Sequence, residues 1–257
     1  MEKYILGDYK LKMNSAQNCS CLVLIRHAQS QWNLENRFTG WADPALTEDG
    51  VIEAIHAGDL LRIRGFSFDR VYTSVLQRSI NTAEIILRQM NLRYLRPYHD
   101  WRLNERHYGV LQGSYKAIVA ERFGYSQVLR WRRGYFDNAD ALELSDARHP
   151  IHDRRYQYID PAMLPAVENL EQTGKRIMAF WRQCVEPDLK NNRRILISSH
   201  GNALRALLKE LTHMSVAEVE SFEIPTAVPI KLTFDSNSML EGWEYLSFIS
   251  DQEQHVN

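Results

Sequence analysis

The feature that most constrains the fold is a run of four apolar residues, 22–25 (Leu-Val-Leu-Ile), which stops on Arg26 and His27. An unbroken apolar run of this length is typical of a short strand that is buried on both faces of a sheet. The strand therefore ends on a fixed cation and an ionisable imidazole. Because open α/β sheets bind ligands at the carboxyl ends of their strands, we expect a functional site there.

A second buried strand ends in the same way. Residues 194–199 (Arg-Ile-Leu-Ile-Ser-Ser) are followed by His200, Gly201 and Asn202 and then by an apolar pattern of helical spacing. The other strands predicted from apolar, β-branched and aromatic runs are residues 69–73, 94–98, 228–234 and 243–248. Strands and helices alternate along the first half of the chain. We therefore predict an α/β fold with three layers, α/β/α, around a mainly parallel central sheet.

Helix-capping patterns place two helices between the first strands. Thr47 suits a helix N-cap, Glu48 and Asp49 suit the first turn, and Gly65 suits the C-terminal end. Arg78 lies in the first turn of the next helix, where a cation opposes the helix dipole. An anionic ligand beside Arg78 would offset that unfavourable interaction.

The alternating pattern breaks down in residues 101–165, which are rich in arginine and aromatic side chains. Long irregular segments inside compact domains are usually functional, so we predict an arginine-rich lid. Within it, residues 145–158 are predicted to be solvated and mobile, and helix resumes at 168–189. No linker or repeat interrupts the rest. We predict one domain over residues 21–250, preceded by an N-terminal extension (residues 1–20) outside the core.

Composition excludes several classes of partner. A formal net charge of −1 over 257 residues gives no general attraction to nucleic acid or anionic membranes, so any basic site is local. No apolar run approaches the roughly 18 residues that span a bilayer, and the first residues lack the apolar core of a signal peptide. The three cysteines, Cys19, Cys21 and Cys184, show no disulfide spacing. We predict a cytoplasmic protein with no nucleic-acid or membrane partner.

The chemically active side chains lie at strand ends, at a helix start or in the insertion: Arg26, His27, Arg78, Glu105, Lys116, Arg132, Arg133 and His200. Two imidazoles and five cations suit a small, multiply anionic ligand, since arginine forks match phosphate and carboxylate oxygens. We predict that neutral His27 attacks phosphorus and that protonated His200 and the arginines stabilise the transferring group. Glu105 would give or take the proton of the substrate hydroxyl.

Each of these residues also has a structural interpretation. A single histidine after a strand is often a packed core residue, and Arg132 and Arg133 are compatible with a solvated helix face. His149 and His152 are spaced like metal ligands, but no cysteine or carboxylate set completes them, so we predict no metal site. The sequence contains neither a P-loop nor a glycine-rich dinucleotide turn.

Several segments resemble one known family. LVLIRHAQSQWN, residues 22–33, is similar to the opening motif of the histidine phosphatase superfamily. Further segments resemble the 2,3-bisphosphoglycerate-dependent phosphoglycerate mutases: NRFTGWADPALTEDG, YTSVLQRSINTAE, WRLNERHYGVLQG, WRRGY and SSHGNALRALLK. The likeness extends from about Leu22 to Leu246. The ERHYG and WRR segments favour a mutase over the general phosphatases.

The resemblance implies interconversion of 3- and 2-phosphoglycerate in glycolysis and gluconeogenesis, through phosphorylated His27, primed by 2,3-bisphosphoglycerate and without a metal. It implies that Glu105 is the proton donor and acceptor, that His200 stabilises the transition state, and that Arg26 and Arg78 bind the transferring phosphoryl group. The substrate-binding positions implied are Ser30, Asn33, Thr39, Gly40, Arg106, His107, Tyr108, Lys116, Arg132, Arg133, Gly201 and Asn202. A homodimer or homotetramer that acts on small phosphorylated three-carbon acids is implied as well.

The sequence departs from the family pattern at three places. Ala28 and Gln29 replace a glycine and a glutamate, Ser114 and Tyr115 replace a leucine-asparagine pair, and residues 137–140 replace a proline-rich run. Glycine permits close backbone approach and positive φ, so a methyl group at residue 28 is expected to crowd the phosphoryl pocket. We expect these changes to alter the rate and the balance between mutase and phosphatase activity.

Two alternatives to a mutase are open at this point. One is a phosphatase of the same superfamily that acts on another phosphorylated metabolite and releases free phosphate without a primer. The other is a non-catalytic module that binds a phosphometabolite. Trapping a phosphohistidine would exclude the second.

Overall fold

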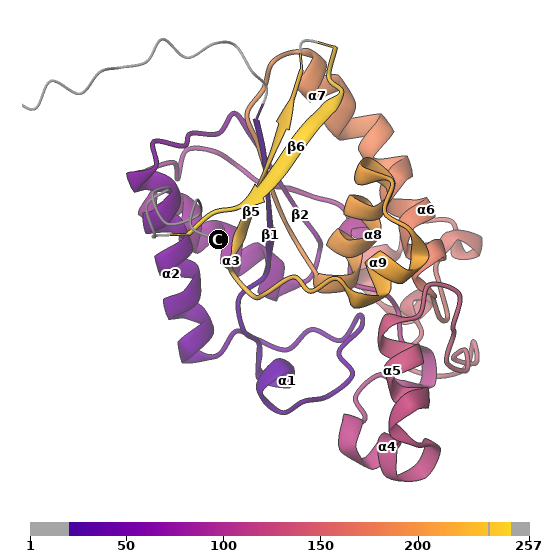
Figure 1. The fold of residues 1–257 in the computed structure, drawn as a ribbon. Coiled ribbons are helices and arrows are strands. Elements are labelled where there is room, and N and C mark those ends of the chain that lie inside the picture. The colour runs from indigo at the N-terminus through magenta and orange to yellow at the C-terminus, as the bar shows by residue number, and fades with distance from the viewer. Residues whose placement is uncertain (1–20, 236, 248–257) are drawn as a thin grey trace, which may run out of the picture.

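The computed structural model describes residues 21–235 and 237–247, which form a six-stranded sheet in the order β3-β2-β4-β1-β5-β6 (Figure 1). The strands are β1 (Cys21–Arg26), β2 (Arg70–Thr73), β3 (Tyr98–His99), β4 (Ile195–Ser199), β5 (Pro229–Phe234) and β6 (Leu240–Tyr245). β4 pairs in parallel with β1 and β2, and β2 in parallel with β3. β5 pairs antiparallel with β1 and β6. The mainly parallel sheet is confirmed, and the predicted extension, 1–20, lies outside the described residues.

Helices cover both faces of the sheet, as Figure 1 shows. They are α1 (Gln31–Leu34), α2 (Glu48–Ile63), α3 (Gln77–Gln89), α4 (Lys116–Phe123), α5 (Tyr125–Arg133), α6 (Leu170–Phe180), α7 (Glu186–Lys190), α8 (Gly201–Thr212) and α9 (Val216–Ser221). None of these helices of the described chain is long and apolar enough to cross a membrane.

The alternation of side chains along β1 explains why its apolar run is unbroken. Leu22 and Leu24 pack with residues of α6 and α8, whereas Val23 and Ile25 pack with residues of α2 and α3. All four side chains are fully buried. Because successive side chains of a strand point to opposite faces, only a strand between two helical layers requires this pattern. The predicted three-layer α/β/α architecture is confirmed.

The predicted strand at 94–98 is wrong except at its last residue, since β3 contains only Tyr98–His99. Asn91 adopts a left-handed conformation (φ +58°), and the amide of Leu95 then donates a hydrogen bond to the carbonyl of Leu92 in a turn. Pro97 also has no N–H for a sheet ladder. The chain therefore reaches the sheet edge only at residue 98.

The insertion, 101–165, is more ordered than its sequence pattern indicates. It contains α4 and α5, which the sequence did not predict and which are separated by Gly124 at φ +84°. Val119 of α4 and Val128 of α5 pack against Phe38 and Tyr108. The helix pair therefore lies beside the segments that surround the carboxyl edge of the sheet (Figure 1).

The prediction that residues 145–158 are solvated is wrong for several of them. His149, Pro150 and Tyr156 are buried, and Tyr156 packs with Trp41. The predicted helix at 168–189 is confirmed in outline, but it divides into α6, a π-turn and α7. The division precedes Pro187, which has no N–H to continue the helical hydrogen-bond pattern.

Candidate active site

The register of the parallel sheet brings the two strand-end histidines together. Arg26, the last residue of β1, lies opposite Ser199, the last residue of β4. The amide of His27 then donates a hydrogen bond of 2.8 Å to the carbonyl of Ser199. As a result, the ring centroids of His27 and His200 lie 5.0 Å apart in an edge-to-face arrangement. The predicted convergence of these imidazoles is confirmed.

The hydrogen bonds of His27 fix its tautomer. Its Nε2 lies 3.2 Å from Nε–H of Arg78, which can only donate, so Nε2 is the acceptor. Its Nδ1 lies 2.7 Å from the carbonyl of Ala28 and therefore carries the proton. Burial, with the nearby charges of Arg78 and Arg26, holds the pKa of His27 well below its usual value. His27 is thus a neutral imidazole with an unprotonated Nε2.

Arg78 is a fully buried cation at the start of α3. It donates hydrogen bonds to the carbonyls of Gly40 (2.9 Å) and Ala42 (2.7 Å), and no described carboxylate forms an ion pair with it. Burial lowers its pKa to about 10, which leaves it charged at neutral pH. A buried charge without a counterion is unfavourable, so this position favours an anionic ligand.

Two further nitrogen atoms beside His27 are buried and have no hydrogen-bond partner among the described residues. They are Nδ1 of His200 and Nε of Arg26. Nε2 of His200 is 2.7 Å from Oγ of Ser74, and Nη1 of Arg26 donates to the carbonyl of Ile224. Burial, with Arg78, lowers the pKa of His200 well below its usual value in the ligand-free site. Buried polar atoms normally have partners, so these two indicate a ligand position.

Glu105 supplies one carboxylate of the site and is nine-tenths buried. Its Oε1 accepts hydrogen bonds from the backbone amides of Arg106 (2.8 Å) and Asn202 (3.2 Å). Its carbonyl accepts from the indole of Trp41 and from the guanidinium of Arg176. These contacts fix the residue from both its backbone and its side chain, while the described residues give Oε2 no partner.

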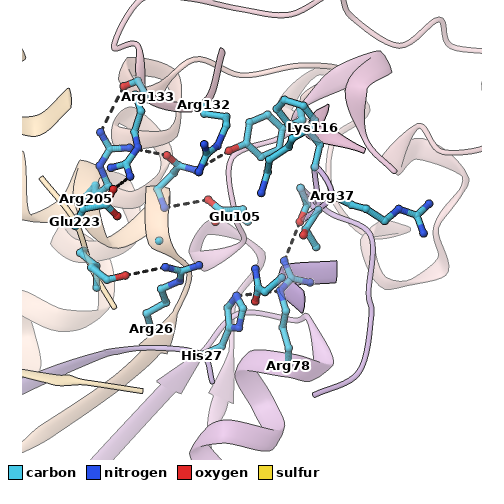
Figure 2. A pocket seen from close by; sticks show the side chains of 18 residues that line it. Arg26, His27, Arg37, Arg78, Glu105, Lys116, Arg132, Arg133, Arg205 and Glu223 are labelled. Atoms are coloured by element: carbon cyan, nitrogen blue, oxygen red, sulfur yellow. Dashed lines mark hydrogen bonds and ion pairs between the residues drawn. The ribbon is translucent and has the colours of Figure 1, made fainter. Parts of the chain in front are cut away.

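These groups surround a cavity of about 110 Å³ at the carboxyl edge of the sheet (Figure 2). The structure places most predicted site residues in its wall: Arg26, His27, Asn33, Thr39, Gly40, Arg78, Glu105, Tyr108, Lys116, Arg132, Arg133, Gly201 and Asn202. The wall carries seven cationic side chains among the described residues, and two of its residues are carboxylates. Desolvation, together with Arg132 and Arg26, lowers the pKa of Lys116 to about 8. The cavity is therefore strongly electropositive.

Four predicted site residues lie outside this wall. His200 lies against the ring of His27. Ser30 donates to Oδ1 of Asn33 and so orients a wall residue. Arg106 is buried and donates to three backbone carbonyls, and His107 is buried against Trp41.

The wall also contains residues that the sequence analysis missed: Arg37, Phe38, Arg205, Glu223 and Ile224. Arg205 follows Gly201 by one helical turn in α8, so its spacing could have indicated it. Its guanidinium donates to Oδ1 of Asn202 and to the carbonyl of Val219.

The expectation that the methyl group of Ala28 crowds the phosphoryl pocket is wrong. Ala28 packs in the apolar core with α2 and α3, is not a wall residue, and is not among the residues with positive φ. Its amide donates to Oγ1 of Thr82. Gln29 also points elsewhere, since its side-chain oxygen accepts from Oγ1 of Thr47. Neither Ala28 nor Gln29 is therefore part of the cavity wall.

The free energy of unfolding is expected to fall as pH falls below about 6.5. The pKa of His107 is lowered to about 4 by burial, and those of His27 and His200 are also lowered. At a pH between the pKa of an imidazole in the unfolded chain, about 6.5, and its lowered pKa in the folded chain, the unfolded chain binds protons that the folded chain does not. Each imidazole then removes about 1.4 kcal/mol per pH unit.

Urea unfolding between about pH 7.5 and pH 5 measures this effect. The variant His107→Gln should show a shallower decline, whereas His56→Gln, at an exposed position on α2, should match the unchanged protein. A stability that stays constant over this range would contradict the assignment of neutral buried imidazoles.

Comparison with known proteins identifies the family. Residues 22–147 and 131–244 match the family model of the histidine phosphatase superfamily (branch 1). The chain belongs to this superfamily. The chain is 44% identical over 235 residues to a 2,3-bisphosphoglycerate-dependent phosphoglycerate mutase from Hamiltonella defensa subsp. Acyrthosiphon pisum (strain 5AT). The match covers 91% of this chain and 94% of that protein.

Solved structures show the same fold. Mycobacterial hydrolase 1 superposes with a TM-score of 0.68 at 20% identity, covering 88% of this chain and 96% of that one. A phosphoglycerate mutase from Bacillus anthracis str. Sterne superposes with a TM-score of 0.62 at 21% identity, covering 90% and 92%. At such identities the likeness concerns the fold alone.

Proposed function

We propose that this enzyme interconverts 3-phosphoglycerate and 2-phosphoglycerate through phosphorylated His27, primed by 2,3-bisphosphoglycerate. The observation that carries the proposal is the neutral His27, whose unprotonated Nε2 lies beside an electropositive cavity that also holds Glu105. The 44% identical relative supports the choice of substrate and primer. The unpartnered nitrogens of Arg26 and His200 fit a phosphoryl group beside His27.

When bound, 2,3-bisphosphoglycerate supplies the phosphoryl group that charges His27. In the next transfer, the bond between Nε2 and phosphorus breaks while the 2-hydroxyl oxygen of 3-phosphoglycerate bonds to phosphorus, and Glu105 accepts the hydroxyl proton. In the return transfer, Nε2 bonds to the 3-phosphoryl group, and Glu105 gives the proton to the leaving oxygen. Arg78 and Arg26 stabilise the charge of the transferring group, with His200 in its protonated form when phosphate is present.

The remaining wall residues divide by their place in the cavity. Gly40 lies next to Arg78, which donates to its carbonyl, and Asn33 and Thr39 belong to the same wall. Lys116, Arg132 and Arg133 lie across the cavity from His27 in Figure 2, and they would hold the carboxylate end of the substrate. Asn202, a wall residue that donates to the hydroxyl of Tyr108, would join them. Ser30, Arg106 and His107 would act by positioning these groups.

The wider assignment rests on the same family membership. We propose a single domain over residues 21–250, in which segment 101–165 acts as a lid over the cavity. We propose a cytoplasmic homodimer or homotetramer that acts in glycolysis and gluconeogenesis on small phosphorylated three-carbon acids. No nucleic acid, membrane or metal ion takes part in the proposed reaction.

A coupled assay for 2-phosphoglycerate tests the function. With 3-phosphoglycerate as substrate, product formation should be slow without primer and should rise severalfold or more when 2,3-bisphosphoglycerate is added. Free phosphate is measured in the same samples. Release of phosphate as the main product, with no response to the primer, would instead identify a phosphatase.

A further inference from the structure

The cavity contains a carboxylate that the proposed reaction does not use. Of the described wall residues, Glu105 and Glu223 are acidic, and only Glu105 has a role in proton transfer. Glu223 lies between α9 and β5 and forms an ion pair with Arg133 at the end of α5 (Figure 2). In the ligand-free protein, a carboxylate of the chain itself is therefore paired with one of the guanidinium groups that would face an anionic ligand.

The backbone around Glu223 is held in place from several sides. The carbonyl of Phe222 accepts a hydrogen bond of 2.9 Å from Arg133, and the carbonyl of Ile224 accepts one of 2.8 Å from Arg26. The hydroxyl of Tyr245 donates to the carbonyl of Glu223 itself. Because the backbone is anchored to two arginines of the wall and to β6, only the side chain of Glu223 is free to leave.

The two partners of this ion pair differ in their freedom to move. The side chain of Glu223 is 68% exposed, whereas that of Arg133 is 17% exposed. Rotation into water therefore solvates the carboxylate fully, while the guanidinium stays in the wall. Burial and the neighbouring charge of Arg132 lower the pKa of Arg133, so an anion beside it is favourable. Glu223 is that anion when no ligand is bound.

We propose that Glu223 is a specificity-determining residue that competes with the second anionic group of the ligand for Arg133. The identity of that group as a carboxylate rests on the proposed function; the competition itself rests on the ion pair. A ligand with a second anionic group displaces Glu223 from Arg133. A ligand with a phosphoryl group alone leaves the pair intact. Glu223 therefore weakens binding of the doubly anionic class and favours its release.

Isothermal titration calorimetry with two matched ligands tests the competition. Glu223→Gln should lower the Kd of 3-phosphoglycerate about two- to fivefold, the range expected for loss of one partly exposed ion pair. It should leave the Kd of glycerol 3-phosphate, which lacks the carboxylate, unchanged. Glu241→Gln, at an exposed position on β6, removes the same charge outside the cavity and should change neither constant.

A second variant separates local competition from a general change in charge. In an Arg133→Met background, Glu223→Gln should no longer alter the Kd of 3-phosphoglycerate. The proposal is overturned if Glu223→Gln tightens both ligands equally, if it tightens neither, or if its effect persists without Arg133. These measurements need no turnover, so a protein that fails the coupled assay can still confirm or overturn the competition.

Discussion

Replacing His27 with alanine is expected to lower kcat by roughly 10⁶-fold, the size of loss seen when a covalent nucleophile is removed. The variant has no nitrogen to accept the phosphoryl group, so neither charging nor transfer occurs. The fold should persist, because the apolar residues of β1 and its pairing with β4 are unchanged. The loss of the acceptor for Nε–H of Arg78 should destabilise the protein by about 1–3 kcal/mol.

The coupled assay measures the loss of turnover, and intact-mass spectrometry after incubation with 2,3-bisphosphoglycerate measures the loss of phosphorylation. The unchanged protein should gain one phosphoryl group, and His27→Ala should gain none. His56→Ala removes an exposed imidazole from α2 and should behave as the unchanged protein in both measurements. Turnover within tenfold of normal in His27→Ala would refute the assignment of the nucleophile.

The sequence predicts the core of this site because local patterns determine where its strands end. The apolar runs before His27 and His200 each require a strand buried between two helical layers. Once both strands are parallel neighbours, Arg26 lies opposite Ser199, and the two imidazoles follow at the same edge. The position of Arg78 in a first helical turn likewise indicates an anionic ligand from the sequence alone.

The rest of the site depends on contacts that no local pattern contains. Glu223 reaches the cavity because Arg133 and Tyr245 anchor its segment, and both are distant in the sequence. Arg106 has the residue type of a phosphate ligand, yet it donates to the carbonyls of Gly134, Asp137 and Glu168 instead. The helices α4 and α5 were missed for a different reason. Few of their residues are buried, so their apolar spacing is weak.

Replacing Glu105 with glutamine is expected to lower kcat for phosphoglycerate interconversion by about 10²–10⁴-fold, the usual contribution of a positioned acid or base. Glutamine keeps the size of the side chain, and its amide oxygen can still accept from the amides of Arg106 and Asn202. The positioning contacts to the Glu105 carbonyl from Trp41 and Arg176 are also unchanged. The loss should therefore fall on kcat, with KM little altered.

A donor with a different leaving group isolates the proton-transfer role of Glu105. An alkoxide such as the 2-oxygen of phosphoglycerate needs a proton as it leaves, whereas p-nitrophenolate is stable as an anion. Phosphorylation of His27 by p-nitrophenyl phosphate should therefore be affected much less by Glu105→Gln than phosphorylation by 2,3-bisphosphoglycerate. Equal losses with both donors would assign Glu105 to positioning alone. Positioning and proton transfer can be separated at Glu105 because its two carboxylate oxygens differ. Oε1 is held by backbone amides, whereas the described residues leave Oε2 without a partner.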